Sequence, residues 1–128
     1  MTLKSYKPYT KSTRTTILVD RKGIWRGRPV KSLTIGKKST GGRNNLGRIT
    51  SRSRGSGHKK RYREIDFYRN KLDKLAKVER IEYDPNRTSF IALIKYEDGS
   101  KNYIICPKNL KVGDEITSGR KKEIKIGN

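Results

Sequence analysis

The sequence has one cysteine, one histidine and no apolar run longer than the five residues 90–94. A run of that length is too short for a transmembrane helix or for the core of a secretory signal. The lone Cys106 cannot form an intramolecular disulfide, which fits a reducing compartment. Its apolar neighbours Ile104 and Ile105 favour a small buried side chain over a reactive thiol.

Residues that carry catalysis or bind metals are equally scarce. A metal site needs three or four His, Cys or carboxylate ligands, and one His with one Cys does not supply them. His58 stands between Gly57 and Lys59, whereas a Ser-His-Asp or Cys-His pair needs its histidine in an orienting apolar pocket. The spacing of a phosphate-binding P-loop is also missing. We therefore predict no enzyme activity, no metal and no cofactor.

Acidic residues are nearly missing from the first half of the chain. Residues 1–63 contain 19 Lys and Arg and a single acid, Asp20, whereas residues 64–128 contain 14 Lys and Arg and 11 acids. Apolar residues show the opposite distribution, with 15 in the first half and 24 in the second. This asymmetry predicts a polyanion-binding first half and a small globular fold in the second.

The basic excess is densest at residues 37–63, which hold ten Lys and Arg, one His, five Gly and no acid. No helical or strand period survives there, so a core-facing helix or strand is not expected. The segment cannot bury enough apolar surface to offset its ordering entropy, and RNA phosphates would order it through Arg forks and glycine N–H groups. A disordered basic linker or a localisation signal is the alternative, although neither needs the glycines and asparagines.

Two features of residues 1–36 leave alternatives open. The arm 1–14 is basic and acid-free, which suits an extended nucleic-acid-binding arm or, less well, an organellar transit peptide, since Pro8 interrupts it and no apolar stripe is present. Trp25 lies among Arg and Lys between Gly23 and Gly27, and either caps a local core or stacks on a base. Short strands are expected at residues 15–19 and 30–35.

The second half reads as a series of short strands with a turn signal about every ten residues. A turn is expected at 84–87, an Asp-Gly hairpin at 97–100, and either a loop or one or two helical turns at 70–76. The expected strands are 65–68, 77–83 with a bulge near Arg80, a central strand 88–96, then 101–106 and 112–116. Five such strands predict an all-β fold, a small five-stranded barrel of the oligonucleotide-binding type, although an SH3-like barrel has similar spacing.

Several motifs resemble those of the second large-subunit ribosomal protein family, the universal family that binds 23S-type rRNA. The most specific motifs are GGRNN at 41–45, GRIT at 47–50, GHKKRYR at 57–63 and VERIEYDPNR at 78–87. Residues 12–14 and 31–36, IDF at 65–67, IAL at 91–93 and IKIGN at 124–128 match as well. The resemblance implies an oligonucleotide-binding-type barrel at residues 64–128 preceded by a basic extension, residues 1–63, threaded into rRNA. It also implies a structural role in assembly of the large subunit, near the peptidyl-transferase region.

The family's second, SH3-like barrel has no counterpart in these 128 residues. We expect a split organellar gene, with a separate chain supplying the second half, and a mitochondrial ribosome in preference to a plastid or bacterial one; a truncated chain is the alternative. Other ribosomal proteins are expected partners, and a membrane is not.

The expected RNA-binding residues are the cations, amides and aromatics that lie in the basic half or follow the family motifs. They are Arg14, Arg21, Trp25, Arg26, Arg28, Lys31, Lys37, Lys38, Arg43, Asn44, Asn45, Arg48, Arg52, Arg54, His58, Lys59, Lys60, Arg61, Tyr62, Arg63, Arg69 and Arg87. Two rival functions remain: a free single-strand-binding barrel of the cold-shock type, which would carry aromatics in a row on its face, and a binder of anionic membranes or acidic proteins, which would need an amphipathic basic helix.

Overall fold

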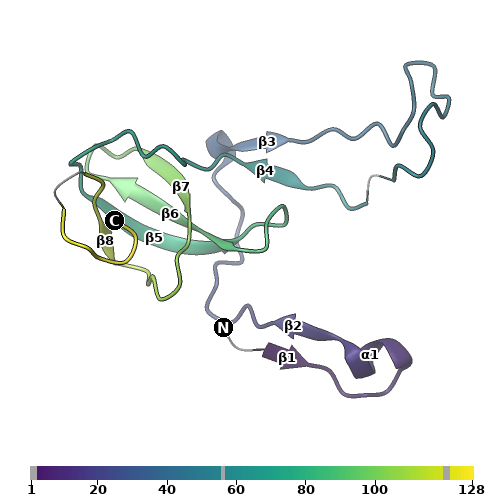
Figure 1. Cartoon of the computed structure of the whole chain (residues 1–128), viewed down its shortest axis with the longest axis horizontal. Helices are drawn as coiled ribbons and strands as arrows, with labels where there is room; N and C mark the ends of the chain where they lie inside the picture. Colours follow the sequence, from purple (N-terminus) through teal and green to yellow (C-terminus); the bar gives the residue numbers. More distant parts are fainter. Residues whose placement is uncertain (1–2, 56, 120–121) are drawn as a thin grey trace.

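The computed structural model describes residues 3–55, 57–119 and 122–128, and it is built mainly from β-strands. Three antiparallel sheets lie apart in space (Figure 1): a four-stranded sheet and two two-stranded hairpins that project from it. In the part of the chain that the structure describes, no helix is long and apolar enough to cross a membrane. The predicted all-β class is confirmed.

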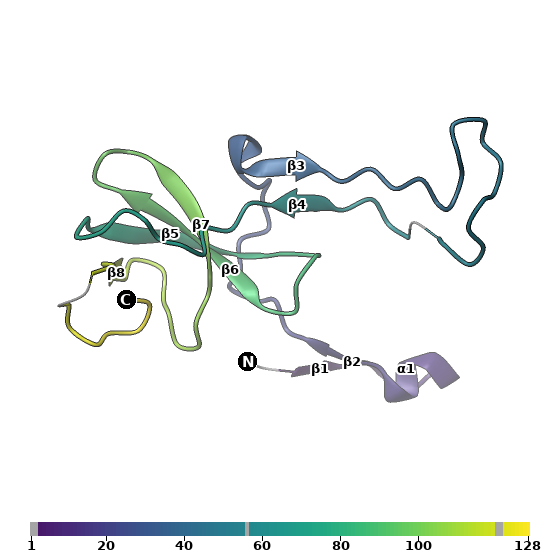
Figure 2. The same ribbon diagram turned by 45° about the horizontal axis from the view of Figure 1, so that its top comes forward.

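The four-stranded sheet has the order β7-β6-β5-β8 and curls into a half-barrel (Figure 2). Its strands are β5 (Ala76–Tyr83), β6 (Phe90–Tyr96), β7 (Lys101–Ile105) and β8 (Glu115–Ile116). The register of β5 against β6 shifts between Val78 and Arg80, which confirms the predicted bulge within a residue or two. Gly99 closes the Asp-Gly hairpin between β6 and β7 at φ +78, a backbone angle that favours glycine.

Strand β6 is buried on both faces because a separate apolar cluster packs on each. One face carries Ala92 and Ile94 with residues of β5, β7 and β8; the other carries Ile91 and Leu93 with Tyr103 of β7. The second cluster is covered by Val30, Leu33 and Ile65, so the chain before residue 64 helps to close the core. The predicted central strand is confirmed.

Residues 34–63 form a long projection that we call the cationic hairpin. Its root is the pair β3 (Thr34–Gly36) and β4 (Arg61–Arg63), with Ile35 opposite Tyr62, and the rest is an irregular loop (Figure 1). The prediction of a single strand at 30–35 was wrong, because a 3-10 turn, η1 (Lys31–Leu33), first turns Leu33 onto the sheet. The prediction of no core-facing strand within 37–63 was also wrong at its end, because Arg63 is 9% exposed.

Residues 3–19 form a second hairpin in place of the extended arm predicted at 1–14, of which residues 1–2 lie outside the described residues. Strands β1 (Leu3–Ser5) and β2 (Ile17–Val19) pair, and the helix α1 (Lys11–Thr15) lies between them. Thr10 begins this helix through a capping box with Thr13. This helix was not predicted. The predicted strand 15–19 is accordingly shortened at its start.

The strand predicted at 65–68 is reduced to a single bridge between Ile65 and Tyr103. Asp66 ends the pairing because one carboxylate oxygen accepts the backbone N–H of Arg69 at 2.8 Å, and Arg69 adopts φ +49. Phe67 and Tyr68 therefore face solvent, 63% and 87% exposed. Residues 70–75 form a loop, one of the two predicted forms, so the described sheet has four strands and not five.

Candidate nucleic-acid interface

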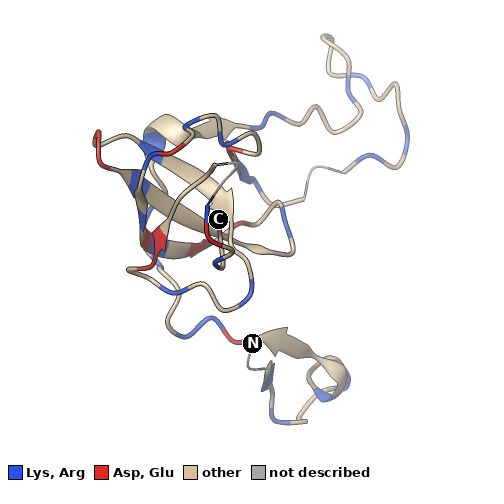
Figure 3. Cartoon of the chain, turned by 60° about the vertical axis from the view of Figure 1, so that its left-hand side comes forward, with Lys and Arg blue, Asp and Glu red and all other residues tan. Residues whose placement is uncertain are grey.

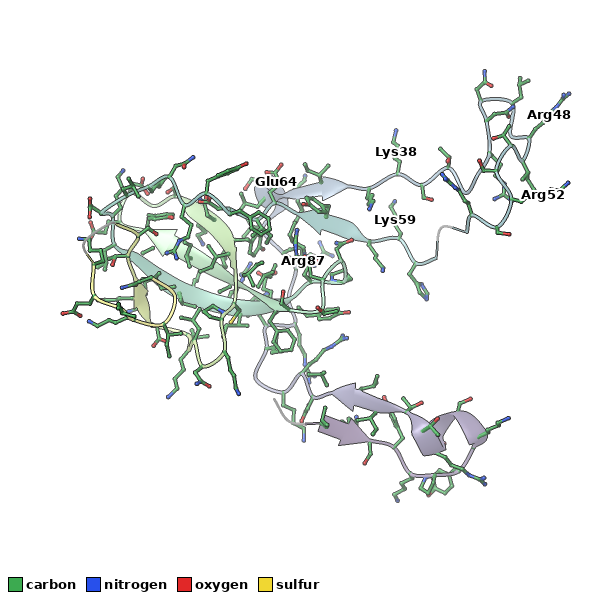
Figure 4. All side chains as sticks on the ribbon, viewed as in Figure 1. Lys38, Arg48, Arg52, Lys59, Glu64 and Arg87 are labelled. Carbon is green, nitrogen blue, oxygen red and sulfur yellow. The ribbon has the colours of Figure 1, made fainter. Side chains whose placement is uncertain are left out.

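The cationic hairpin carries exposed positive charge along its whole length. Figure 3 shows Lys and Arg as its only charged residues, whereas most of the acidic residues lie on the four-stranded sheet and its loops. Asp20, directly after β2, lies apart from them. In Figure 4, Lys38 and Lys59 lie on opposite arms, and Arg48 and Arg52 point outward at the tip. Because no carboxylate lies within residues 34–63, this charge is free to attract a polyanion.

A groove of about 940 Å³ lies between the two arms of the cationic hairpin. The lysines and the histidine of both arms line it, and Asn86 closes it at the side of the sheet. The cations and the histidine of this lining are Lys37, Lys38, His58, Lys59 and Lys60. A groove with cations on both walls and no acid suits a phosphodiester backbone, which would be neutralised from both sides.

The tip of the hairpin is folded around Gly42. The carbonyl oxygen of Gly42 accepts the N–H groups of Thr50 at 2.9 Å and Ser51 at 3.1 Å. The side-chain oxygen of Asn44 accepts the N–H groups of Leu46 at 3.1 Å and Arg48 at 2.9 Å. The side-chain oxygen of Asn44, a residue predicted to contact RNA, therefore stabilises the loop.

At the root, the turn after β5 fixes the cationic hairpin to the sheet through Asp84, which is wholly buried. Its carboxylate lies 2.9 Å from Nη1 of Arg87 and 3.6 Å from Nη1 of Arg63. The same carboxylate accepts the backbone N–H of Asn86 at 2.9 Å, and the Asn86 side chain donates to the carbonyl of Arg61 at 2.7 Å. We call these four side chains, Asp84, Asn86, Arg87 and Arg63, the Asp84 anchor.

The segment between the two hairpins runs along the edge of β5. Trp25 donates its backbone N–H to Ile81 at 2.9 Å, and the Arg80 guanidinium lies 4.7 Å from the indole centroid. Gly27 lies so close that a Cβ there would be 2.6 Å from indole atoms. Trp25 thus packs on Gly27 and Arg80 and stays 48% exposed, so capping and base stacking both stay predictions. On the same edge, Arg21 lies 3.6 Å from the Tyr83 ring centroid.

Arg80 also pairs with the buried Glu82 at 2.7 Å, and Glu82 accepts the hydroxyl of Tyr103 at 3.0 Å. The Tyr103 oxygen in turn accepts the N–H of Val30 at 3.0 Å. Burial raises the pKa of the Tyr103 phenol, which keeps it protonated as a donor to Glu82. This network joins residues 25–30 to the sheet.

The other predicted RNA-binding residues fall into three groups. Arg14 lies on α1, away from the sheet, and Arg26, Arg28 and Lys31 are exposed between the hairpins. Arg69 donates to the carbonyl of Gly127 and is half-buried on the sheet side. The remaining residues of the loop and β4 are exposed on the cationic hairpin: Arg43, Asn45, Arg54, Arg61 and Tyr62.

Three residues of this region were not among those predicted: Asp84, Asn86 and Phe67. Asp84 and Asn86 were interpreted as turn residues and Phe67 as a strand residue, and all three stand in motifs that resemble the family, at 78–87 and 65–67. These motifs, and an acid directly before Pro85 in a basic protein, were the available signals. Among the described residues, no cluster of three or more His, Cys, Asp or Glu side chains is placed to hold a metal ion.

Comparison with known proteins gives consistent matches. A family model described as ribosomal proteins L2, RNA binding N-terminal domain, matches residues 30–118. The chain is 62% identical over all its residues to proteins named large ribosomal subunit protein uL2 from Granulibacter bethesdensis, Ruegeria pomeroyi and Rickettsia canadensis. These alignments cover 46% or 47% of the relatives, so the chain spans about half their length.

Proposed function

This chain belongs to the ribosomal protein L2 family, and from that premise we propose that it is a structural constituent of the large ribosomal subunit. It binds 23S-type rRNA, supports subunit assembly near the peptidyl-transferase region and has no catalysis of its own. The observation that carries this proposal is the acid-free cationic hairpin, fixed at its root by the buried Asp84 anchor. A free single-strand binder would instead be expected to carry its aromatic row on the sheet face.

The 22 residues named from the sequence are proposed as rRNA contacts, and those on the cationic hairpin are proposed to act in two roles. Side chains along the arms, such as Lys38 and Lys59, neutralise phosphates from both walls of the groove. Outward side chains at the tip, such as Arg48 and Arg52, reach a second segment of RNA. Arg63 and Arg87 hold the root in place through Asp84, and only the guanidinium atoms that do not face Asp84 are proposed to contact RNA.

The salt dependence of binding tests the electrostatic part. Each phosphate neutralised contributes about −0.7 to −0.9 to the slope of log affinity against log salt. If about half of the ten cations in residues 37–63 are engaged, we expect a slope of roughly −4 for a 23S-type rRNA fragment. Co-sedimentation with large subunits in low salt gives the functional control. A slope near zero would contradict the electrostatic part, and failure to co-sediment with large subunits in low salt would contradict the proposal.

The domain division is a proposal as well: residues 1–63 as the RNA-binding extension and 64–128 as the folding unit. Limited proteolysis of the free chain distinguishes two outcomes. A resistant core beginning near residue 64 supports the division. A core beginning near residue 30 would move the boundary, because Val30 and Leu33 pack on the sheet.

Two finer proposals concern the setting of the protein. A separate chain is proposed to carry the rest of the family sequence, since the relatives are about twice as long. A mitochondrial location stays a prediction, and the relatives named above are bacterial. Intact-mass measurement of purified subunits tests the first: a chain of about twice 14.8 kDa that contains this sequence would contradict it. Fractionation of the source cells tests the second.

A further inference from the structure

We propose that Phe67, with Arg87 and Tyr62, forms a stacking site for one unpaired RNA base at the root of the cationic hairpin. This inference rests on the proposed RNA-binding function and names a contact that the sequence did not indicate. The site joins a loop residue of the sheet side, a turn residue after β5 and a strand residue of β4.

The three side chains lie together on an exposed surface. The Arg87 guanidinium carbon is 5.3 Å from the ring centroid of Tyr62 and 6.0 Å from that of Phe67. Phe67 is 63% exposed and Tyr62 is 37% exposed. Ile35, opposite Tyr62 in the strand pair and 52% exposed, extends the apolar surface. The result is a patch of flat and apolar groups in the most basic region of the chain.

Phe67 is held in place although its ring is exposed. The residue before it, Asp66, donates its backbone N–H to the Tyr103 carbonyl at 2.8 Å. The carboxylate of Asp66 accepts the side chain of Asn102 at 2.7 Å and the N–H of Arg69 at 2.8 Å. An exposed aromatic ring on a fixed bend loses little further freedom when a ligand stacks on it, which favours binding.

The chemistry of Arg87 indicates a base and not a phosphate as the occupant. Its Nη1 donates to Asp84 at 2.9 Å and its Nη2 donates to the Tyr62 hydroxyl at 3.2 Å. These bonds use the donor edge that a phosphate would need. The Arg87 side chain is 17% exposed, so it supports the two rings from below, and the more exposed ring of Phe67 offers the stacking surface. Flat aromatic and guanidinium faces are the surfaces on which unpaired bases stack.

The neighbouring groove supplies the rest of the nucleotide chain. Asn86, next to Arg87, lines the groove between the arms together with Lys59 and Lys60. A strand whose phosphates lie in the groove can therefore place a base on Phe67 as it leaves the root. An acidic protein surface fits less well, because a flat apolar patch offers it no added charge.

The test uses the full chain and two probes. One is a single-stranded RNA of about 12 nucleotides, within the range of single-strand sites, made of uridines with one central 2-aminopurine. The other is an RNA duplex of similar length, whose bases are already stacked. For Phe67→Ala we expect single-strand affinity to fall on the order of tenfold, with quenching of the 2-aminopurine lost. Duplex affinity and the salt slope should be unchanged, and Phe67→Tyr should behave as wild type.

Tyr68→Ala is the matched control, because this neighbour is 87% exposed and is not among the described cation–aromatic contacts. An equal loss in Tyr68→Ala, or an equal loss on the duplex, would overturn the assignment to Phe67. Unchanged single-strand binding by Phe67→Ala would also overturn it, and a protein partner would then be the better candidate for this patch. Failure of the proposed function looks different: the wild-type chain would bind neither probe.

Discussion

Replacing Asp84 by Asn should loosen the cationic hairpin from the sheet. The variant keeps the shape of the side chain and the oxygen that accepts from Asn86, but it removes the charge that faces Arg63 and Arg87. Arg63 loses most by this change, because Asp84 is the carboxylate that faces its guanidinium. The residue is 9% exposed, and its Nε is buried with no hydrogen-bond partner among the described residues. An unpaired buried guanidinium would then remain at the root.

Breaking one partner of a buried ion pair costs about 3–5 kcal/mol. That is a large fraction of the roughly 5–15 kcal/mol by which small domains are stable. With an m-value of about 2 kcal/mol/M, the urea midpoint should fall by about 2 M. Asp73→Asn makes the same charge change at an exposed pair, Asp73 with Lys122 at 3.2 Å, where we expect about 0–1 kcal/mol.

The RNA affinity of the variant shows whether Asp84 acts by holding the cationic hairpin in position or only through its charge. Asp84→Asn raises the net charge by one, so electrostatics alone predicts slightly tighter binding. If the Asp84 anchor holds the groove in shape, binding should weaken instead, whereas Asp73→Asn should not weaken it. A stability change in Asp84→Asn as small as in Asp73→Asn, or tighter binding by both variants, would refute the reasoning. Should Asp84→Asn not fold, Asn86→Ala removes only the bonds to Asp84 and to the Arg61 carbonyl, and serves as the milder variant.

Three further outcomes are expected. In Gly42→Ala, the new Cβ would lie 2.3 Å from the Ser51 backbone oxygen. The clash should weaken the bond from the Ser51 N–H to the Gly42 carbonyl, so amide exchange at Ser51 should accelerate. Gly47→Ala is the control, because Gly47 has a similar positive φ and nothing within 4 Å of the new Cβ; equal effects of the two changes would contradict the clash. Burial raises the pKa of the Cys106 thiol, so near pH 8 a thiol reagent should react more slowly with the folded chain than with the urea-unfolded chain, and equal rates would contradict its burial. Arg→Lys changes at three exposed sites keep the charge but lose the planar fork, and should impair incorporation into large subunits in a reconstitution assay; normal incorporation would refute this. The three sites are Arg43, Arg48 and Arg61.

The sheet was predictable because its strands obey local rules. The two-sided apolar run 90–94 indicated a central strand, and the Asp-Gly pair at 98–99 fixed the turn to the next strand. A strand boundary such as that at Asp66 depends on one side chain capping a backbone N–H, so no period in the sequence shows it. The charge asymmetry likewise indicated where the exposed positive charge lies without revealing its hairpin form.

The Asp84 anchor could not be predicted for a different reason. In the sequence, the Asp-Pro-Asn-Arg segment is fully accounted for by a turn, and Arg63 by its place in a basic loop. Neither pattern calls for a contact between them. Their contact joins positions 21 residues apart, and an ion pair leaves no period in either segment. A single buried carboxylate in so basic a chain thus has a role that charge counting misses. It lowers the positive charge locally, yet it fixes the root from which the other nine cations of residues 37–63 project. The few apolar residues of the hairpin stay exposed, so buried charge fixes its position where other segments rely on an apolar core.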